Sequence, residues 1–384
     1  MATGARRGRR DACLSLAATA VAVSSFVAGT AGATASTNAA IHGALASFAI
    51  PHQMAPVQLF AGTDGRVWFV TAGSQLGEVR GEGMATLTGV TLPSGSDFGN
   101  PTPATIAAAG PEGVWAYAAT EGAPHAAVDS CSVALVQPGG QVMEPRLPAS
   151  LSDFACTSAA ADPSGSLWAG LVSGKFLSGC HCRVAIVAQV TTSGQVTLYP
   201  PVRAGARPQA VALGADGAIR ALEGYDIESI GRYTAGAPPT GMSLPFGGWT
   251  DLLARPDGSY WLLRELFCSG LNQPFCPAVS LLSASGSVSN RHIYPVSVPG
   301  GGPLNVRTAV GPDGGLWMAG RQSTGPNRLF RMDANGQIDR SAGLVAPGGA
   351  PLQATGPITV TPAGTVWAAA AAGSSSYLVR YRPA

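Results

Sequence analysis

The stretch Pro312-Asp313-Gly314-Gly315-Leu316-Trp317 decides the fold, because variants of it recur along the whole chain. Each copy holds a Pro-Asp-Gly turn or a relative of it, then an apolar residue, and in six of seven copies a Trp. The glycines of successive copies are 48, 52, 52, 41, 56 and 50 residues apart. The other copies lie at 63–68, 111–115, 163–168, 215–220, 256–261 and 362–367. A repeat of about 50 residues indicates an array of similar structural units.

Each copy of this motif has the chemistry of a tight turn between two strands. Pro sets φ at the first turn position, Asp or Ser bonds to nearby backbone amides, and Gly takes the positive φ that other residues avoid. Small apolar residues such as 105–109 precede the turn, and a strand that carries the Trp follows it. Residues 329–332 and 196–199 are typical of a third and a fourth strand. The pattern therefore predicts an all-β fold, a seven-bladed β-propeller with four-stranded blades.

The two ends of the repeat array predict how the ring closes. The seventh copy supplies strands at 358–360, 366–368 and 377–380 and is then one strand short. Residues 47–50 precede the first blade and have the composition of a strand. We therefore expect an N-terminal strand to close the last blade, within a propeller that spans residues 45–384. The Trp of each motif should then fill the space between blades as core.

Residues 1–35 have the layout of a secretory signal peptide. Four arginines lie among the first ten residues, a weakly apolar run covers 12–29, and small residues at 31–35 offer cleavage sites. Residues 36–44 would then be a short linker, and the mature protein would be secreted or extracytoplasmic. An uncleaved membrane anchor is the alternative, although hydroxyl side chains interrupt the apolar run. The pair Arg9-Arg10 leaves the twin-arginine route open beside the general secretory one, although the next two residues fit that signal poorly.

Composition and charge exclude several classes of protein. The 384 residues are 46% hydrophobic and 11% charged, with 51 Gly and 30 Pro, which excludes disorder and disfavours long helices. Without the leader, 19 basic and 20 acidic side chains remain, a net charge of about −1. No basic run remains downstream, so nucleic-acid binding has no electrostatic support. No second apolar stretch reaches the length of a membrane span, so we expect none after signal cleavage.

Six cysteines follow the leader, and an even number in an exported protein indicates disulfides rather than a metal site. They are Cys131, Cys156, Cys180, Cys182, Cys268 and Cys276. Cys268 and Cys276 are eight residues apart in one predicted loop, which favours their pairing. A bridge between Cys180 and Cys182 would close a strained, very small ring. We therefore predict that the first two cysteines each pair with one of these two, which would link blades two and three.

The loops after second and fourth strands share one face of the predicted ring, at the mouth of its channel. We call this the loop-bearing face. Three of its loops, at 119–132, 172–182 and 265–277, are long, and long loops on a rigid scaffold usually bind ligands. The repeat also places six charged side chains of blades four to six there: Glu223, Asp251, Arg264, Glu265, Arg307 and Arg321. They could orient a polar ligand; alternatively, Asp–Arg pairs among them close the channel mouth.

Three histidines, His52, His125 and His181, also fall on loops of that face. Three imidazoles can bind a metal ion, but no spacing rule ties these three together. We therefore expect solvent-exposed side chains and no metal site.

The stretches 110–115 and 311–317 resemble the repeat of the virginiamycin B lyase (streptogramin B lyase) family, roughly G-P-D-G-x-L-W-F-T-E. The resemblance covers about residues 45–384, and other propeller families carry similar turns. It implies a seven-bladed propeller and a carbon–oxygen lyase that linearises a cyclic depsipeptide by elimination. It also implies Mg²⁺, with catalytic His and Glu residues in late blades. Only Glu223 matches the Glu of the family repeat, and no His lies between His181 and His292. The catalytic residues therefore stay unknown.

Two functions remain open at this stage. The first is a secreted, monomeric, non-catalytic propeller that binds a small molecule, a peptide or a cell-envelope component at its loop-bearing face, with no cofactor. The second is a virginiamycin B lyase-like enzyme with a rearranged active site and Mg²⁺. The fold alone does not choose between these two functions. The first is favoured because the acid–base residues of the lyase family are missing.

Overall fold

The computed structural model describes residues 43–80, 83–97, 100–121, 130–176, 183–224, 228–245, 247–267, 275–289, 292–293, 296–297, 307–322 and 326–383. All of them belong to one compact unit that begins at residue 40. The predicted signal peptide, residues 1–35, lies outside the described residues. None of the helices in the described part of the chain has the length and apolar character that crossing a bilayer requires.

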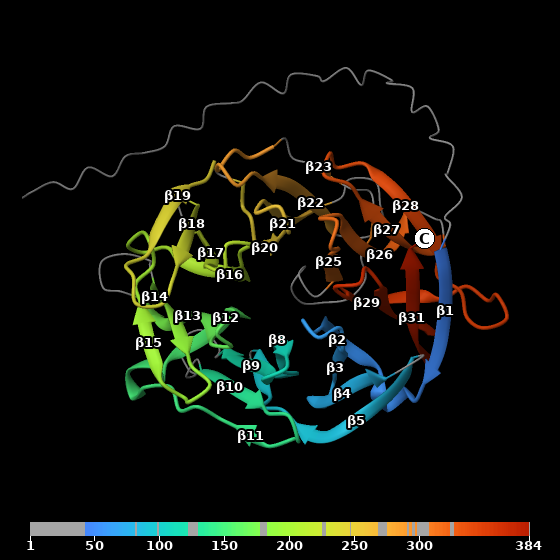
Figure 1. Cartoon of the computed structure of the whole chain (residues 1–384), viewed down its shortest axis with the longest axis horizontal. Coiled ribbons are helices and arrows are strands. Elements are labelled where there is room, and N and C mark those ends of the chain that lie inside the picture. The colour runs from blue at the N-terminus through green and yellow to red at the C-terminus, as the bar shows by residue number, and fades with distance from the viewer. Residues whose placement is uncertain are drawn as a thin grey trace, which may run out of the picture. The chain divides into compact units, whose positions relative to one another are not determined.

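Seven sheets follow one another around a ring, with the first strand of each blade innermost (Figure 1). The strands of blade one are β2 (Pro56–Ala61), β3 (Val67–Thr71), β4 (Gln75–Arg80) and β5 (Met84–Thr91). Those of blade three are β12 (Phe154–Ala161), β13 (Leu167–Phe176), β14 (Arg183–Val190) and β15 (Val196–Tyr199). Those of blade four are β16 (Arg207–Leu213), β17 (Ile219–Gly224), β18 (Ser229–Tyr233) and β19 (Thr240–Ser243). Those of blade five are β20 (Asp251–Ala254), β21 (Tyr260–Phe267), β22 (Phe275–Leu282) and β23 (His292–Ile293). The predicted seven-bladed β-propeller is confirmed.

Blade seven is completed from the other end of the chain. Its strands, from the inside outward, are β29 (Gln353–Val360), β30 (Val366–Ala372), β31 (Ser375–Pro383) and β1 (Gly43–Ile50). β1 runs antiparallel to β31 with Gly43 opposite Pro383, and the blue β1 lies beside the red β31 in Figure 1. The predicted closure by an N-terminal strand is therefore observed, and the strand starts at residue 43 rather than 45.

Blades two and six carry strands beyond the predicted four. Blade two contains β8 (Thr105–Gly110), β9 (Gly113–Glu121), β10 (Ser130–Val136) and β11 (Val142–Met143), together with β6 (Gly95–Asp97) and β7 (Asn100–Thr102). Blade six contains β25 (Thr308–Val310), β26 (Leu316–Gln322), β27 (Asn327–Met332) and β28 (Ile338–Gly343), together with β24 (Val296–Ser297). β6 and β24 pair with the ends of β9 and β26, beyond the residues paired with the inner strands. Both additions build up the loop-bearing face.

The repeated turn forms through the bonds that its composition predicts. In blade three, Asp162 Oδ1 accepts the backbone N–H of Ser164 at 2.9 Å, and Gly165 has φ of 80°. Trp115 Nε1 donates to the carbonyl oxygen of Gly165 at 2.8 Å, across the boundary between blades two and three. Trp261 Nε1 does the same to the turn glycine of blade six at 3.0 Å. All six motif Trp side chains are buried, which confirms them as core between blades.

The hydrophobic core lies between neighbouring blades, because each sheet buries both of its faces. Side chains alternate along a strand, so Ile219 and Ala221 of β17 pack toward Trp168 of blade three. Leu222 is the next residue of β17, and it packs instead with Trp249 at the start of blade five. A residue's parity along a second strand therefore decides which neighbouring blade it contacts.

Side chains of the inner strands also bond to the backbone of the next blade. The Gln58 amide donates to the Ile106 carbonyl oxygen at 3.0 Å and accepts the Ile106 N–H at 2.5 Å. Ser158 Oγ accepts the N–H of Val211 at 3.1 Å. Buried polar groups are stable when they are bonded in this way, so these residues tie the blades together around the channel.

One disulfide links blades two and three, and its pairing differs from the prediction. Cys131 on β10 is bonded to Cys156 on β12, with Cα atoms 5.0 Å apart. The prediction that each pairs with Cys180 or Cys182 is therefore wrong. Cys131 lies in a strand that packs against β12, not in the long loop that the sequence predicts. Its partner is therefore the cysteine directly across the blade boundary. Cys180, Cys182 and Cys268 lie outside the described residues, as does the side chain of Cys276.

Candidate functional site

The loop-bearing face is raised by three extended hairpins. β9, β13 and β21 have 9, 10 and 8 residues, whereas the second strands of blades one and four have 5 and 6. Much of what the sequence predicts as long loop is therefore continuous strand. The disulfide Cys131–Cys156 joins two of these raised blades. The face thus has a rigid base in blades two and three.

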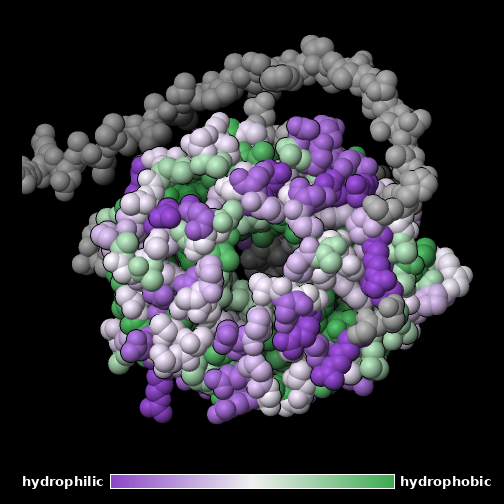
Figure 2. Space-filling model, viewed as in Figure 1, coloured by the Kyte–Doolittle hydropathy of each residue, from purple (hydrophilic) through white to green (hydrophobic). Residues whose placement is uncertain are grey.

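The channel of the ring holds a cavity of about 280 Å³. The inner strands of all seven blades line it, mostly with Ala, Val and Leu. Polar side chains enter from Gln58, Thr105, Tyr117, Thr308 and Thr359. Figure 2 shows hydrophobic residues beside the central hollow and hydrophilic residues over much of the surrounding face. The channel wall is therefore largely apolar with a few polar groups, as in many ligand sites.

Tyr117 is the titratable side chain among the residues that line this cavity. It is 7% exposed on β9, and burial raises the pKa of its phenol to about 12. A hydrogen bond with Thr105 opposes this shift, and the negative charge of Asp251 adds to it. Tyr117 therefore stays a neutral phenol near neutral pH. Asp251 acts on it from blade five, so both groups belong to the channel region.

Glu223 lies away from the channel, between blades three and four. It is fully buried on β17, on the same side of the strand as Ile219 and Ala221. Its Oε2 accepts the N–H of Val202 at 3.0 Å, and its Oε1 accepts a short hydrogen bond from the Tyr233 hydroxyl. Burial raises the pKa of Glu223, and these hydrogen bonds oppose the shift. Glu223 joins the two blades rather than facing the channel mouth.

Arg264 packs against the boundary between blades four and five. Its guanidinium lies 5.8 Å from the centre of the Trp249 ring and donates a short hydrogen bond to the Gly247 carbonyl oxygen. Glu228 holds the same segment, since its two carboxylate oxygens accept the N–H groups of Gly247 and Trp249 at 2.9 and 3.0 Å. This segment leads into the inner strand of blade five, so Arg264 and Glu228 position that strand.

The remaining predicted residues occupy different environments. Asp251 and Arg307 are buried at the starts of the inner strands of blades five and six, 4% and 5% exposed. Arg321 is exposed on β26 and pairs with Ser297 of β24. The side chain of Glu265 is not among those described. The structure therefore places Asp251, Arg307 and Arg321 at the loop-bearing face, Arg264 beside the segment that leads to Asp251, and Glu223 between blades three and four.

Sequence reasoning missed Tyr117 and Glu228. Tyr117 stands two residues after a motif Trp, and that spacing on a second strand places both side chains on one face of the sheet. Glu228 carries no comparable signal, because its partners are backbone amides of a distant loop. Both residues became recognisable only from contacts between blades.

No metal-binding group of three or more His, Cys, Asp or Glu side chains occurs among the described residues. His52 is exposed, with Nδ1 3.3 Å from the Ser376 hydroxyl oxygen. His125 and His181 lie outside the described residues. No Mg²⁺ site is therefore assigned to this part of the chain.

Comparison with known proteins identifies the fold. No protein family profile matches the sequence, and no curated protein is similar to it in sequence. Among solved structures, a catalytically inactive virginiamycin B lyase from Staphylococcus aureus with quinupristin is similar over 89% of this chain and 100% of its own. The TM-score is 0.57 at 18% sequence identity. The chain is thus a virginiamycin B lyase-like propeller in architecture.

Two other solved structures are similar at the level of fold. YCF48 bound to D1 peptide gives a TM-score of 0.51 at 13% identity, over 88% of this chain and 96% of its own. A puromycin hydrolase variant complexed with PGG gives 0.58 at 16% identity, over 86% of this chain and 53% of its own. Lyase, hydrolase and peptide-bound proteins therefore share this architecture, and the shared fold does not select among them.

Proposed function

We propose that this protein is a secreted, non-catalytic propeller that binds a peptide, a small molecule or a cell-envelope component at its loop-bearing face. The environment of Glu223 is the observation that carries this proposal. Glu223 matches the Glu of the lyase repeat, yet both its oxygens accept hydrogen bonds within the interface of blades three and four. A general base must reach the proton that it removes, and a fully buried, bonded carboxyl does not.

The construction of the loop-bearing face supports binding there. The hairpins of blades two and three rise from it and are joined by the disulfide. Asp251 and Arg307 supply charges of both signs beside a largely apolar channel. YCF48, a propeller of similar fold, is bound to a peptide, which is consistent with a peptide ligand for this scaffold.

The alternative is a virginiamycin B lyase-like enzyme with a rearranged site. Its support is the similarity of fold to a lyase structure that contains quinupristin. Elimination at the ester needs a base for the proton α to the carbonyl and a cation that stabilises the enolate. The chain has no His between His181 and His292 that could serve as the base in blades four and five.

Incubation with quinupristin and Mg²⁺ separates the two functions. Elimination opens the ring without changing the mass, so chromatographic retention and fragmentation spectra are the readout. We expect the quinupristin to stay cyclic over a long incubation. Ring opening that depends on Mg²⁺ would establish the lyase alternative instead.

The binding face is tested by selecting ligands from a random displayed peptide library on the immobilised protein. Hydrogen exchange of the complex then maps the contact surface. We expect protection at the starts of inner strands, near residues 105–108, 251–254 and 308–310. Protection confined to the opposite face, at the Pro-Asp-Gly turns, would contradict the proposal.

The structural role of Glu223 predicts a particular pH dependence of stability. Burial raises its pKa in the folded state above the ordinary value of 4.5, so the folded protein retains a proton that the unfolded chain loses. Stability should therefore fall as pH rises above 4.5 and approaches the folded pKa. Glu223→Gln should fold and lose this limb in urea unfolding series. An unchanged pH profile in the variant would argue against the structural role.

A further inference from the structure

A pocket of about 500 Å³ lies among the repeated turns, at the end of the channel opposite the loop-bearing face. Its volume is within the range of small-molecule sites. The half-buried ends of inner strands form its base, and the exposed first residues of the turns form its rim. The rim residues come from blade one and blades three to seven: Thr63, Pro163, Ala215, Pro256, Pro312 and Pro362. We call this space the turn-face pocket.

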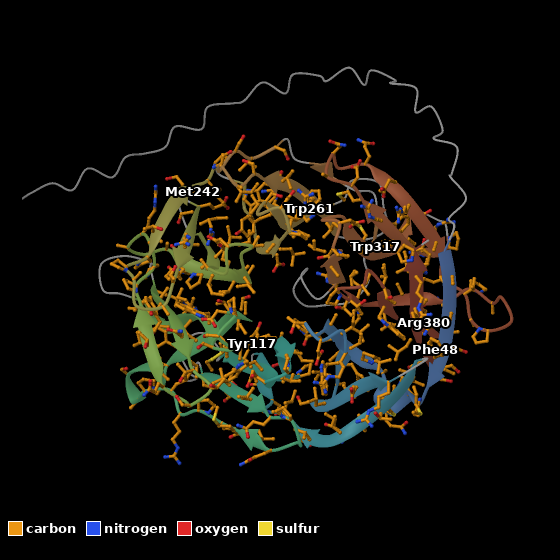
Figure 3. All side chains as sticks on the ribbon, viewed as in Figure 1. Phe48, Tyr117, Met242, Trp261, Trp317 and Arg380 are labelled. Carbon is orange, nitrogen blue, oxygen red and sulfur yellow. A yellow bond between two sulfur atoms is a disulfide. The ribbon has the colours of Figure 1, made fainter. Side chains whose placement is uncertain are left out.

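The base of the turn-face pocket is apolar and adjoins the channel cavity. Five residues line both spaces, and each is the last residue of its inner strand: Ala61, Leu213, Ala254, Val310 and Val360. Figure 3 shows Tyr117, which lines the channel cavity, near the middle of the ring, and Met242 at its outer edge. The pocket therefore lies on the axis of the ring, with aliphatic side chains at its floor.

The rim of the turn-face pocket is rigid. Four of its six residues are prolines, whose rings fix the backbone angle φ. In blades five, six and seven, the turn glycine also donates its N–H to the carbonyl oxygen three residues earlier, at 3.1, 2.9 and 2.8 Å. The proline rings are therefore held in place before any ligand arrives, and such preorganisation lowers the entropic cost of binding.

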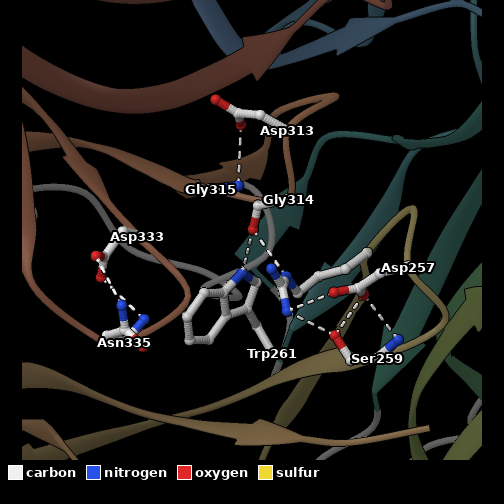
Figure 4. A network of polar contacts seen from close by, with 9 residues as sticks. Asp257, Ser259, Trp261, Asp313, Gly314, Gly315, Asp333 and Asn335 are labelled. Atoms are coloured by element: carbon white, nitrogen blue, oxygen red, sulfur yellow. Dashed lines mark hydrogen bonds and ion pairs between the residues drawn. The ribbon is translucent and has the colours of Figure 1, made fainter.

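Arg255 is the charged side chain among the described residues that line the turn-face pocket. Its Nε donates to the Gly314 carbonyl oxygen at 2.9 Å, and its Nη1 donates to Ser259 at 2.7 Å (Figure 4). The same Nη1 lies 3.0 Å from the Asp257 carboxylate. The motif copies align Arg255 with Thr361, so blade seven adds no charge here. Because the charge of Arg255 is balanced within the protein, the pocket favours an uncharged ligand.

We propose that the turn-face pocket binds an uncharged aromatic molecule of two or three rings, which packs against the exposed proline rings of the rim. Proline and aromatic rings are complementary surfaces, as in the docking of proline-rich peptides on aromatic-lined grooves. An apolar cavity of about 150 Å³ holds one benzene ring, so a pocket of about 500 Å³ has room for about three. This site is separate from the loop-bearing face, so it stands or falls independently of the function proposed above.

Fluorescence titration of the purified protein with two related probes tests the proposal. N-phenyl-1-naphthylamine is uncharged and becomes fluorescent when it leaves water, and 8-anilinonaphthalene-1-sulfonate has the same rings with one negative charge. We expect saturable one-to-one binding of the uncharged probe in the micromolar range, and binding of the sulfonate that is at least about tenfold weaker. Absence of saturable binding of the uncharged probe would overturn the proposal, as would equal affinity for the sulfonate.

A pair of proline variants locates the bound probe. Pro312→Ala removes one ring from the rim and should weaken binding about fivefold, because apolar contact with the probe is lost. Pro111→Ala makes the same change in the turn of blade two, which is not among the residues that line the pocket. Both prolines are exposed, so both variants should fold, and Pro111→Ala should bind as the wild type does. Equal affinity of the two variants would overturn the proposal.

A pair of tryptophan variants blocks the pocket. Ala215→Trp places an indole at the rim, where it should occupy the pocket itself and abolish binding of the probe. Ala363→Trp is the matched control, because Ala363 is also exposed in a turn but lines a separate pocket of about 430 Å³ between blades seven and one. Wild-type affinity in Ala215→Trp, or loss of binding in Ala363→Trp, would overturn the proposal. A dimer in sedimentation that Ala215→Trp dissociates would also overturn it, since a second copy of the chain would then cover the pocket.

Discussion

The boundaries between blades five and six and between blades seven and one start from the same motif but end in different structures. At the first, Arg255 comes from the turn and covers Trp261 at 5.3 Å, tied to Asp257 of its own turn. At the second, Arg380 comes from the third strand and covers Trp367 at 5.8 Å. One boundary is thus closed by a network within the protein, and the other keeps a pocket.

This difference shows that the motif specifies the turn and the Trp but not what lies beside them. The arginine that covers the Trp comes from the turn in blade five and from the third strand in blade seven. The space beside the Trp differs between these two cases. Arg331 of blade six also comes from the third strand, opposite Trp317 in register, and it pairs with Asp313 of its own turn at 2.7 Å and with Asp339. Blade seven has Ala363 at the position of Asp313. The turn of blade seven therefore supplies no carboxylate to the arginine of its third strand.

The largest expected effect comes from removing the Trp at each boundary. Trp261→Ala should destabilise the protein by about 3–5 kcal/mol, because it leaves a cavity and removes one of the two donors to the Gly314 carbonyl oxygen. Trp367→Ala should cost less, because Trp367 borders a pocket and the wall can relax into it. Urea unfolding of both variants measures the difference. Equal losses would mean that the two boundaries pack equally tightly.

Removing Arg255 should have the next largest effect. Arg255→Ala deprives the Gly314 carbonyl of one of its two donors and uncovers Trp261, at a cost of about 1–3 kcal/mol. Arg255→Met keeps most of the stem and should recover part of the packing but none of the hydrogen bonds. Thermal unfolding of the pair separates these contributions. Identical stability of the two variants would show that the bonds to Gly314 and Ser259 dominate.

Transplanting the blade-five pair into blade seven should change stability little. Thr361→Arg with Ala363→Asp adds an ion pair at the rim of an open groove, where such pairs contribute within about 1 kcal/mol. Urea unfolding gives this number, and a crystal structure of the variant shows whether the new arginine lies over Trp367. A loss of several kcal/mol would mean that Arg380 and the new side chain compete for one space.

The smallest effect concerns the pH dependence of the blade-five turn. Burial alone would raise the pKa of Asp257, but hydrogen bonds from Ser259 and the charge of Arg255 hold it below its ordinary value of 3.8. The carboxylate therefore stabilises the fold above pH 3.8, and this contribution disappears as pH falls through the folded pKa. Asp257→Asn should be less stable than the wild type near pH 6 and should converge with it in acid. A gap that persists in acid would point to a steric cause.

The repeat register predicted the positions of some candidate-site residues, but it did not predict the contacts that side chains make between blades. Asp251 and Arg307 lie at the face that the repeat register predicts, because that register counts from the turn. Glu223 lies between blades instead. Successive side chains of a strand point to opposite faces of the sheet, so a shift of one position changes which neighbour a side chain contacts. The pairing of Cys131 with Cys156 was missed for a related reason. Sequence spacing placed Cys131 in blade two and Cys156 in blade three but did not show that their side chains face each other.

The sequence by itself determined the number of blades, the turn of each blade and the strand that closes the ring. These follow from local chemistry that repeats about every 50 residues: Pro and Gly set the turn, and the missing strand of the last copy requires one from the N-terminus. Only the tertiary structure decided the disulfide partner, the burial of Glu223 and the pocket between blades seven and one. Each depends on side chains that meet across a blade boundary, where the partners are distant in sequence and strand parity sets their direction.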